Sequence, residues 1–334
     1  MDTASQLFAA RYVRRQVKQL TGQWQGVRHA EDLEFIHRAR VATRRLRAAL
    51  RLFHDGFPRR KVRRWQKTLR RMTARLGRAR DCDVQIEFLC GALSSLVDKE
   101  CFPAVSRILV RLERQRERLQ RPVVRAVNRI ESSGVLQSMR RATKRILRTT
   151  PTNNTTVDAM AQPRRRILRQ LDAMLGHRHC LADPNDRAGH HALRIAMKRL
   201  RYTLEIVRPL YCGQLDEAFD GAKQLQTLLG EVHDCDVWCD QLDRFAVSER
   251  RRLTSRFGRP DRMSHLQPGL DYLRTDRQRR RDAVFGQLIE ICDDLNRRQV
   301  WPRLAGLVVA YQPLTPVEPN ATASQKPPSN DPRP

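Results

Sequence analysis

Apolar residues recur every three or four positions along most of this chain, a spacing that places them on one side of an α-helix. Val13, Val17, Leu20, Trp24 and Val27 follow this spacing and predict a first helix over about residues 4–27. Further helices are predicted at 37–53, from Pro58 to about 89 with a break or bend at Leu76-Gly77, after Pro103, and from Gly134 to Arg148. In the second half the pattern predicts helices around 168–175, 191–207, 225–237 and 284–295. Alternating β-branched runs do not compete with it, so we predict an all-α protein built from two helical bundles.

Two polar stretches interrupt the apolar pattern. The stretch TTPTNNTTVD at Thr149–Asp158 predicts a linker. From about Gln312 the chain is rich in Pro, Asn, Ser and Thr without any period, which is typical of disorder. We therefore predict a first bundle at 1–149, a linker at 150–157, a second bundle at 158–312 and a disordered tail at 313–334.

The predicted helix at 37–53 has two contrasting faces. One face, on steps of three and four residues, is basic and carries His37, Arg40, Arg44, Arg47 and Arg51. The opposite face is apolar and carries Ala39, Ala42, Leu46, Ala49 and Phe53. An ordinary solvated face mixes acids with bases, and that remains the simpler interpretation, but this face carries no acid between His37 and His54. Its natural complement is an anion.

The same pattern occurs a second time in the chain. HRARVATRRLR at His37–Arg47 matches HALRIAMKRLR at His191–Arg201, and LGRARDCDV at Leu76–Val84 matches LGEVHDCDV at Leu229–Val237. Two blocks in the same order and at nearly the same separation predict two copies of one supersecondary unit. If the two bundles meet about a pseudo-twofold axis, the two basic faces line a cleft or pore along about 15 Å of helix.

The charge of the chain is strongly positive. Lysine and arginine number 65 against 36 acids, which gives a net charge of +29. Such a field attracts nucleic acid, anionic membrane surfaces or inorganic phosphate chains, and arginine binds phosphate through two parallel hydrogen bonds. The chain contains no run of about 20 apolar residues and no signal-peptide pattern, so we expect a cytoplasmic protein without a membrane partner.

Three groups of residues suggest enzyme or metal chemistry, each with a structural alternative. Asp81, Asp83, Asp234 and Asp236 could bind metal, but we favour a role in capping amides or orienting arginines. Cys235, Cys239 and His233 could share a metal ion, but the matching positions of the first copy are Cys82, Ile86 and Arg80, so only one thiol is shared and we interpret the cysteines as reduced structural residues. His54-Asp55 and His233-Asp234 resemble phosphohydrolase dipeptides, although neither histidine recurs in the other copy.

The repeated residues resemble the CHAD family, the conserved histidine α-helical domain. The resemblance rests on H-x-x-R-[VI]-A-x-[RK]-R-L-R at His37 and His191, with L-G-x-x-x-D-x-D-V downstream of each. It covers about residues 4–300 and implies two antiparallel four-helix bundles related by a pseudo-twofold axis, with the basic helices lining a central pore. It also implies non-catalytic binding of inorganic polyphosphate, often at polyphosphate granules. Glu231, which stands where the first copy has Arg78, departs from the basic pattern.

We therefore predict a stand-alone polyphosphate-binding protein without catalytic residues, cofactor or metal. The predicted phosphate ligands, with the last three in second rank, are His37, Arg40, Arg44, Arg45, Arg47, His191, Arg194, Lys198, Arg199, Arg201, Arg51, Arg70 and Lys223. The two histidines are expected to donate more strongly once protonated below about pH 6.5. Nucleic acid is the main rival ligand, but single-strand binders use aromatic stacking platforms, and aromatic residues make up only 6% of this chain. A metal-dependent phosphohydrolase is the third possibility.

Overall fold

The computed structural model describes residues 3–30, 32–149, 161–257 and 260–310. Every regular element among them is helical, so the predicted all-α class is confirmed. The first half contains α1 (Thr3–Thr21), α2 (Trp24–His29), α3 (Leu33–Leu52), α4 (Arg59–Ser95), α5 (Phe102–Ser132) and α6 (Val135–Thr149). The second half contains α7 (Ala161–Leu175), α8 (Arg187–Val207), α9 (Asp216–Phe257), α10 (Gln267–Arg297) and α11 (Val300–Ala310). Short 3₁₀ turns join several of these helices.

Two predicted helix boundaries differ from the structure. The helix predicted at 4–27 is divided, because α1 ends at Thr21, whose hydroxyl donates to the Val17 and Lys18 carbonyls at 3.1 and 3.2 Å, and α2 begins at Trp24. The expected break or bend at Leu76-Gly77 is not an interruption, since α4 runs through it without a gap. Both residues are buried there, and packing outweighs the helix cost of about 1 kcal/mol for a single glycine.

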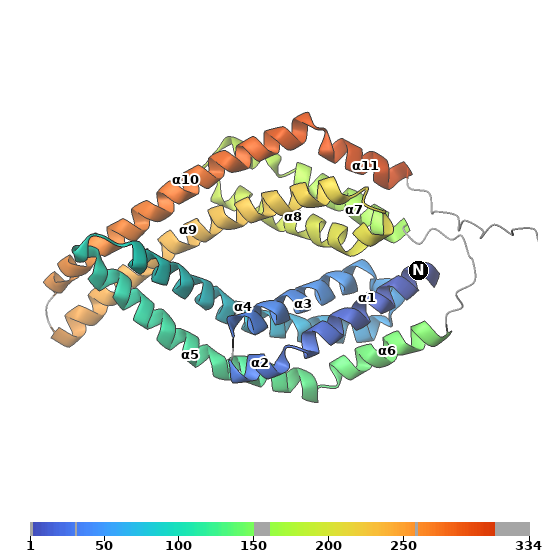
Figure 1. Ribbon diagram of the computed structural model, residues 1–334, viewed down its shortest axis with the longest axis horizontal. Coiled ribbons are helices and arrows are strands. Elements are labelled where there is room, and N and C mark those ends of the chain that lie inside the picture. Colours follow the sequence, from blue (N-terminus) through green and yellow to red (C-terminus); the bar gives the residue numbers. More distant parts are fainter. Residues whose placement is uncertain (1–2, 31, 150–160, 258–259, 311–334) are drawn as a thin grey trace, which may run out of the picture.

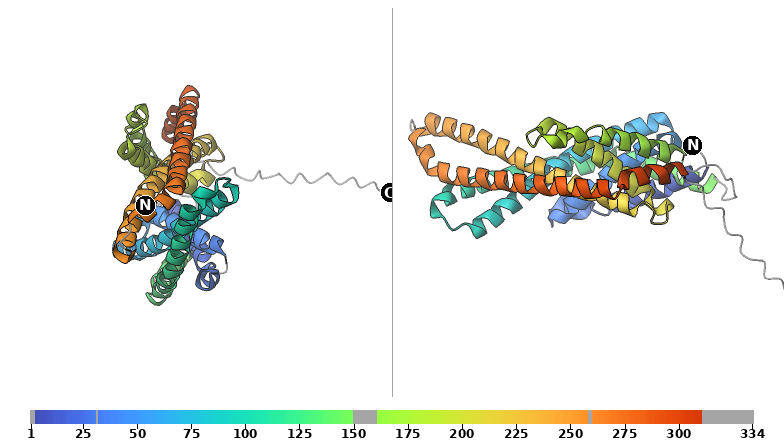
Figure 2. Two further views of the ribbon diagram at one scale, coloured as in Figure 1. Left: turned by 90° about the vertical axis from the view of Figure 1, so that its left-hand side faces the viewer. Right: turned by 90° about the horizontal axis from the view of Figure 1, so that it is seen from above.

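The two halves lie along each other, and their long hairpins converge at one end. Figure 1 shows α1–α6 on one side and α7–α11 on the other, with the tips of the α4–α5 and α9–α10 hairpins converging. Figure 2 shows the molecule end-on in its left panel and again as an elongated arrangement, seen from above, in its right panel. A hydrophobic cluster joins the hairpin tips, in which the rings of Phe88 and Trp238 are 5.0 Å apart. The main core likewise contains buried residues of both halves, including Leu46 of α3 and Leu200 of α8.

Apolar contacts cross between the halves, and the predicted division into two bundles stays a prediction. The predicted linker at 150–157 and the tail at 313–334 lie outside the described residues. No helix in the described part of the chain is long and apolar enough to cross a membrane.

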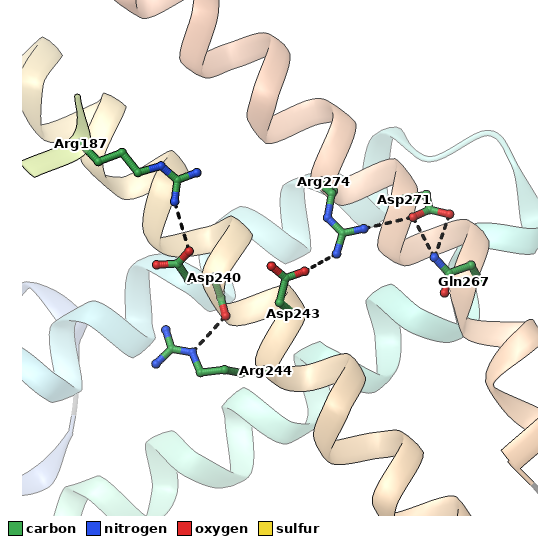
Figure 3. Close-up of polar contacts among 7 residues, drawn as sticks. All are labelled: Arg187, Asp240, Asp243, Arg244, Gln267, Asp271 and Arg274. Carbon is green, nitrogen blue, oxygen red and sulfur yellow. Dashed lines mark hydrogen bonds and ion pairs between the residues drawn. The ribbon is translucent and has the colours of Figure 1, made fainter. Parts of the chain in front are cut away.

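A polar network links α8, α9 and α10 (Figure 3). Arg274 of α10 pairs with Asp243 of α9 and, at 3.3 Å, with Asp271 of its own helix. Arg187, at the start of α8, reaches Asp240 of α9 at 3.3 Å. These pairs are exposed, so each contributes at most about 1 kcal/mol, and the buried apolar residues supply most of the hairpin's stability.

Candidate polyanion-binding site

Helices α3 and α8, which carry the repeated basic motif, begin with equivalent caps. The Asp32 carboxylate accepts a hydrogen bond from the Glu34 backbone N–H at 2.9 Å, and Asp186 accepts one from Gly189 at 2.8 Å. Each cap satisfies an N–H group that the first helical turn leaves unpaired. The start of each basic helix is thereby fixed by its own sequence.

Burial of the apolar face of α3 determines where its arginines point. Leu46 is completely buried, as is Leu200 at the equivalent position of α8. The rest of the predicted apolar stripe of α3 is also buried: Ala39, Ala42, Ala49 and Phe53. Each large apolar side chain contributes about 1.5–3 kcal/mol when removed from water. The charged face therefore turns away from the core.

This charged face borders a cavity of about 820 Å³ formed by α3, α4, α7 and α8. Among the residues that the structure describes, nine cationic side chains line it: Arg40, Arg44, Arg47, Arg51, Arg78, Arg166, Arg169, Lys198 and Arg199. Among the described lining residues Asp81 is the one acid, and it is paired with Arg40 at 3.4 Å. The cavity thus has a large excess of positive charge. A second cavity of about 300 Å³ shares Arg47 and Arg51 with it and adds Arg63, Gln66, Lys67 and Arg70.

Crowding of cations in this cavity perturbs their ionisation. Burial, followed by the charges of Arg44, Arg194, Arg40 and Arg201, lowers the pKa of Lys198 to about 8. Burial and neighbouring arginines likewise lower the pKa values of Arg44 and of Arg51 to about 10. The side-chain Nε atoms of Arg44 and Arg194 are buried without a hydrogen-bond partner. A bound polyanion would relieve this repulsion.

Comparison with known proteins agrees with this geometry. The family model of the CHAD domain matches residues 11–243. This chain belongs to the CHAD domain family. The crystal structure of the CHAD domain from the plant Ricinus communis has a TM-score of 0.61 at 22% identity and covers 86% of this chain and 93% of that chain.

PptA from Streptomyces chartreusis has a TM-score of 0.57 at 17% identity and covers 85% of this chain and 98% of that chain. At such identities both likenesses concern the fold alone. No protein with curated information matches this sequence.

The structure brings together only part of the predicted CHAD site. Six of the predicted ligands line the larger cavity: Arg40, Arg44, Arg47, Arg51, Lys198 and Arg199. Arg70 lines the smaller adjoining cavity instead. The remaining predicted ligands are not among the lining residues of either: His37, Arg45, His191, Arg194, Arg201 and Lys223. Their contact with phosphate stays a prediction.

Two of these motif arginines already hold a carboxylate. Arg45 of α3 donates through Nε to Oε1 of Glu205 at 2.6 Å, and Arg201 donates through Nη1 to Oε2 of the same residue at 3.2 Å. Arg201 also donates through Nε to Gln226 Oε1 at 2.6 Å. This cluster, which we call the Glu205 clasp (Arg45, Arg201 and Glu205), joins α3 to α8 across the two halves.

The two CHAD histidines have different surroundings. Burial, followed by Arg80, Arg40 and Arg44, lowers the pKa of His37, and the charge of Glu34 only partly opposes this. The ring of His191 lies 5.0 Å from that of His233. A lowered pKa keeps His37 neutral at pH 7, so the stronger hydrogen bond to phosphate that is expected from its protonated form requires a lower pH.

The aspartates of the second CHAD block hold arginines in fixed positions. Asp83 accepts from Arg116 of α5 at 2.5 Å, and Asp236 accepts from Arg281 of α10 at 2.8 Å. Asp81 pairs with Arg40 on the basic helix itself, as expected for an orienting carboxylate. Asp236 also pairs with Arg187 of the basic helix α8 at 3.1 Å, as expected. The partner of Asp83 differs from expectation, because Arg116 lies on the following outer helix rather than on the neighbouring basic helix. Among the described residues, no three potential metal ligands come together.

Several lining residues were missed by the sequence reasoning. Arg166 and Arg169 of α7 enter the cavity, as does Arg78 of α4, which the sequence marked only through its exchange for Glu231. Arg166 and Arg169 could not be recognised from the sequence as lining residues, since arginines three residues apart on a basic helix are common in this chain. Only the packing of α7 against α8 turns Arg166 and Arg169 toward the motif residues.

Proposed function

We propose that this protein binds inorganic polyphosphate without catalysis in the cavity between α3, α4, α7 and α8. Membership of the CHAD family supports a polyphosphate-associated role in general. The observation that carries the finer proposal is the lining, where nine cations and a single, already paired acid converge. Arginine binds phosphate oxygens through two hydrogen bonds, and a linear anion can contact several such groups at once. We further propose a cytoplasmic location, at polyphosphate granules.

The state of the one aromatic residue in the lining argues against nucleic acid. Tyr202 is 7% exposed, and its ring is covered by Arg44 and Arg201, whose guanidinium carbons lie 5.0 and 4.3 Å from the ring centroid. A ring covered in this way offers no free face on which a base could stack. The cavity therefore suits phosphate groups without bases.

A phosphohydrolase fits the site less well. Such an enzyme holds its metal ions with several carboxylates placed around the phosphate. In the described lining the carboxylate is Asp81, which neutralises Arg40. We infer that the site retains polyphosphate rather than cleaving it. Incubation with polyphosphate and Mg²⁺ should release no more phosphate than a protein-free control, and turnover that disappears in Asp81→Asn would contradict this inference.

The deciding experiment is a competition at physiological salt. Labelled long-chain polyphosphate is displaced by single-stranded DNA of matched phosphate count, in the wild type and in Arg44→Ala/Lys198→Ala. We expect a preference for polyphosphate of at least tenfold, about 1.4 kcal/mol, and loss of that preference in the double variant. Arg114→Ala/Arg118→Ala removes the same charge from the exposed side of α5 and serves as the matched control. Equal competition with an unaffected double variant would mean that only the overall charge attracts polyanions.

A further inference from the structure

The repeat assigns opposite charges to one equivalent pair of positions in the two basic helices. Glu205 lies 154 residues after Arg51, the same separation as that between His37 and His191. Arg51 lines the cavity, whereas the carboxylate of Glu205 is the centre of the Glu205 clasp. The basic helix of the second half therefore ends in an acid where that of the first half ends in a cavity-lining base.

The Glu205 clasp also occupies two further motif positions. In the same register Arg201 corresponds to Arg47 and Arg45 corresponds to Arg199. Arg47 and Arg199 line the cavity, while Arg45 and Arg201 are engaged by Glu205. On one side of the crossing between α3 and α8, Glu205 thus neutralises Arg45 and Arg201. On the other side, the equivalent Arg199 and Arg47 remain in the cavity lining.

Two more cavity positions have an uncharged or an acidic counterpart in the other half. The counterpart of Arg166 is Tyr12, and burial followed by the charge of Glu205 raises the pKa of this phenol to about 12, so it stays neutral. The counterpart of Arg78 is Glu231, which accepts from Arg280 at 2.6 Å. Cations of the cavity lining are therefore replaced at equivalent positions on three different helices, α1, α8 and α9.

We propose that Glu205 is a specificity-determining residue that ends the basic track, so that a polyphosphate chain engages the site from the side of Arg51 and stops at the Glu205 clasp. This inference rests on the proposed function. A phosphate that advanced to Arg45 or Arg201 would have to displace a carboxylate from two hydrogen-bonded guanidinium groups, and it would meet the negative charge of that carboxylate. Glu205 thereby limits how many phosphates one protein molecule holds.

The test compares Glu205→Gln with the wild type at several polyphosphate chain lengths and salt concentrations. Two observables matter: the chain length at which affinity stops rising, and the slope of log affinity against log salt, which reports the number of phosphate contacts. In Glu205→Gln we expect the plateau at longer chains and a slope steeper by about 1.4, since each of the two released arginines adds about 0.7. Glu217→Gln is the matched control, because it removes one acid that pairs with Arg298 and Arg303 rather than with the motif.

The inference would be overturned if Glu205→Gln and Glu217→Gln reached their affinity plateau at the same chain length and had the same salt slope, even where both variants bind polyphosphate. A wild type that binds no polyphosphate would instead refute the proposed function, and the inference with it. Should Glu205→Gln fail to fold, arginine modification of the wild type still decides the question. Long-chain polyphosphate should protect Arg51 from phenylglyoxal and leave the reactivity of Arg45, whose side chain is 36% exposed, unchanged. Protection of Arg45 would overturn the inference.

Discussion

Lys198 should make polyphosphate binding depend on pH in a range where most proteins show little change. It is the one lysine among the described residues that line the cavity, and the charged groups facing it are Arg194 and Arg201 of its own helix and Arg40 and Arg44 of α3. Burial and these charges lower its pKa to about 8. A bound polyanion favours the protonated amine, so binding above pH 8 should be accompanied by proton uptake.

The size of the effect follows from the pKa of Lys198 in the free protein. At pH 7, about one unit below this pKa, the amine is almost fully protonated in both the free and the bound states, and Lys198 contributes little pH dependence. At pH 9, with the pKa at about 8, only about one free molecule in eleven carries the proton. The affinity should therefore fall about tenfold between pH 7 and pH 9, which corresponds to about 1.4 kcal/mol.

The measurement is the dissociation constant of a fixed-length polyphosphate between pH 6.5 and 9, at constant ionic strength. Calorimetry at pH 9 in two buffers of different ionisation enthalpy gives the number of protons taken up, which should approach one. Lys198→Arg keeps the positive charge but does not titrate in this range, so its profile should be flat. A flat wild-type profile, or an equal decline in Lys198→Arg, would refute the link between the crowded cations and the ligand.

Two further predictions concern stability. The side chain of Asp83 is 1% exposed and that of Arg116 is 13% exposed, so Asp83→Ala leaves a nearly buried arginine without its carboxylate. This variant should lower the free energy of unfolding, measured by urea titration, by about 3 kcal/mol. Asp282→Ala, at an exposed position, should change it by less than about 0.5 kcal/mol. Equal effects would show that the Asp83 pair does not hold α4 to α5. A Cβ at Gly269 would lie 2.3 Å from the Cys101 carbonyl oxygen, so Gly269→Ala should destabilise the meeting point of α10 and α5 by about 1–3 kcal/mol. Gly286→Ala, in open space on the same helix, should stabilise by up to about 1 kcal/mol, and a gain at both positions would contradict the close approach.

Much of the fold could be predicted because helix periodicity is a local property. The spacing of Leu46 and its apolar neighbours predicts both the position of α3 and which of its faces is buried, because the apolar face is defined by the sequence of the helix alone. The boundaries that failed depend on contacts outside this pattern. α1 ends at Thr21 although the apolar spacing continues to Val27, and α4 continues through Gly77, which is buried.

The site was predictable only in part, because a motif defines which cations a helix carries but not which partner each one meets. Arg45 and Arg199 occupy the same motif position, yet the first reaches Glu205 and the second enters the cavity. Glu205 was visible in the sequence as an ordinary residue near the end of the second basic helix, and its effect arises only where α3 crosses α8. A carboxylate at this crossing satisfies two arginines that would otherwise repel each other, so it stabilises the contact between the halves while it removes two cations from the ligand's reach. The repeat in the sequence is nearly symmetric in composition, but the charge available to a ligand differs between the two sides of the crossing.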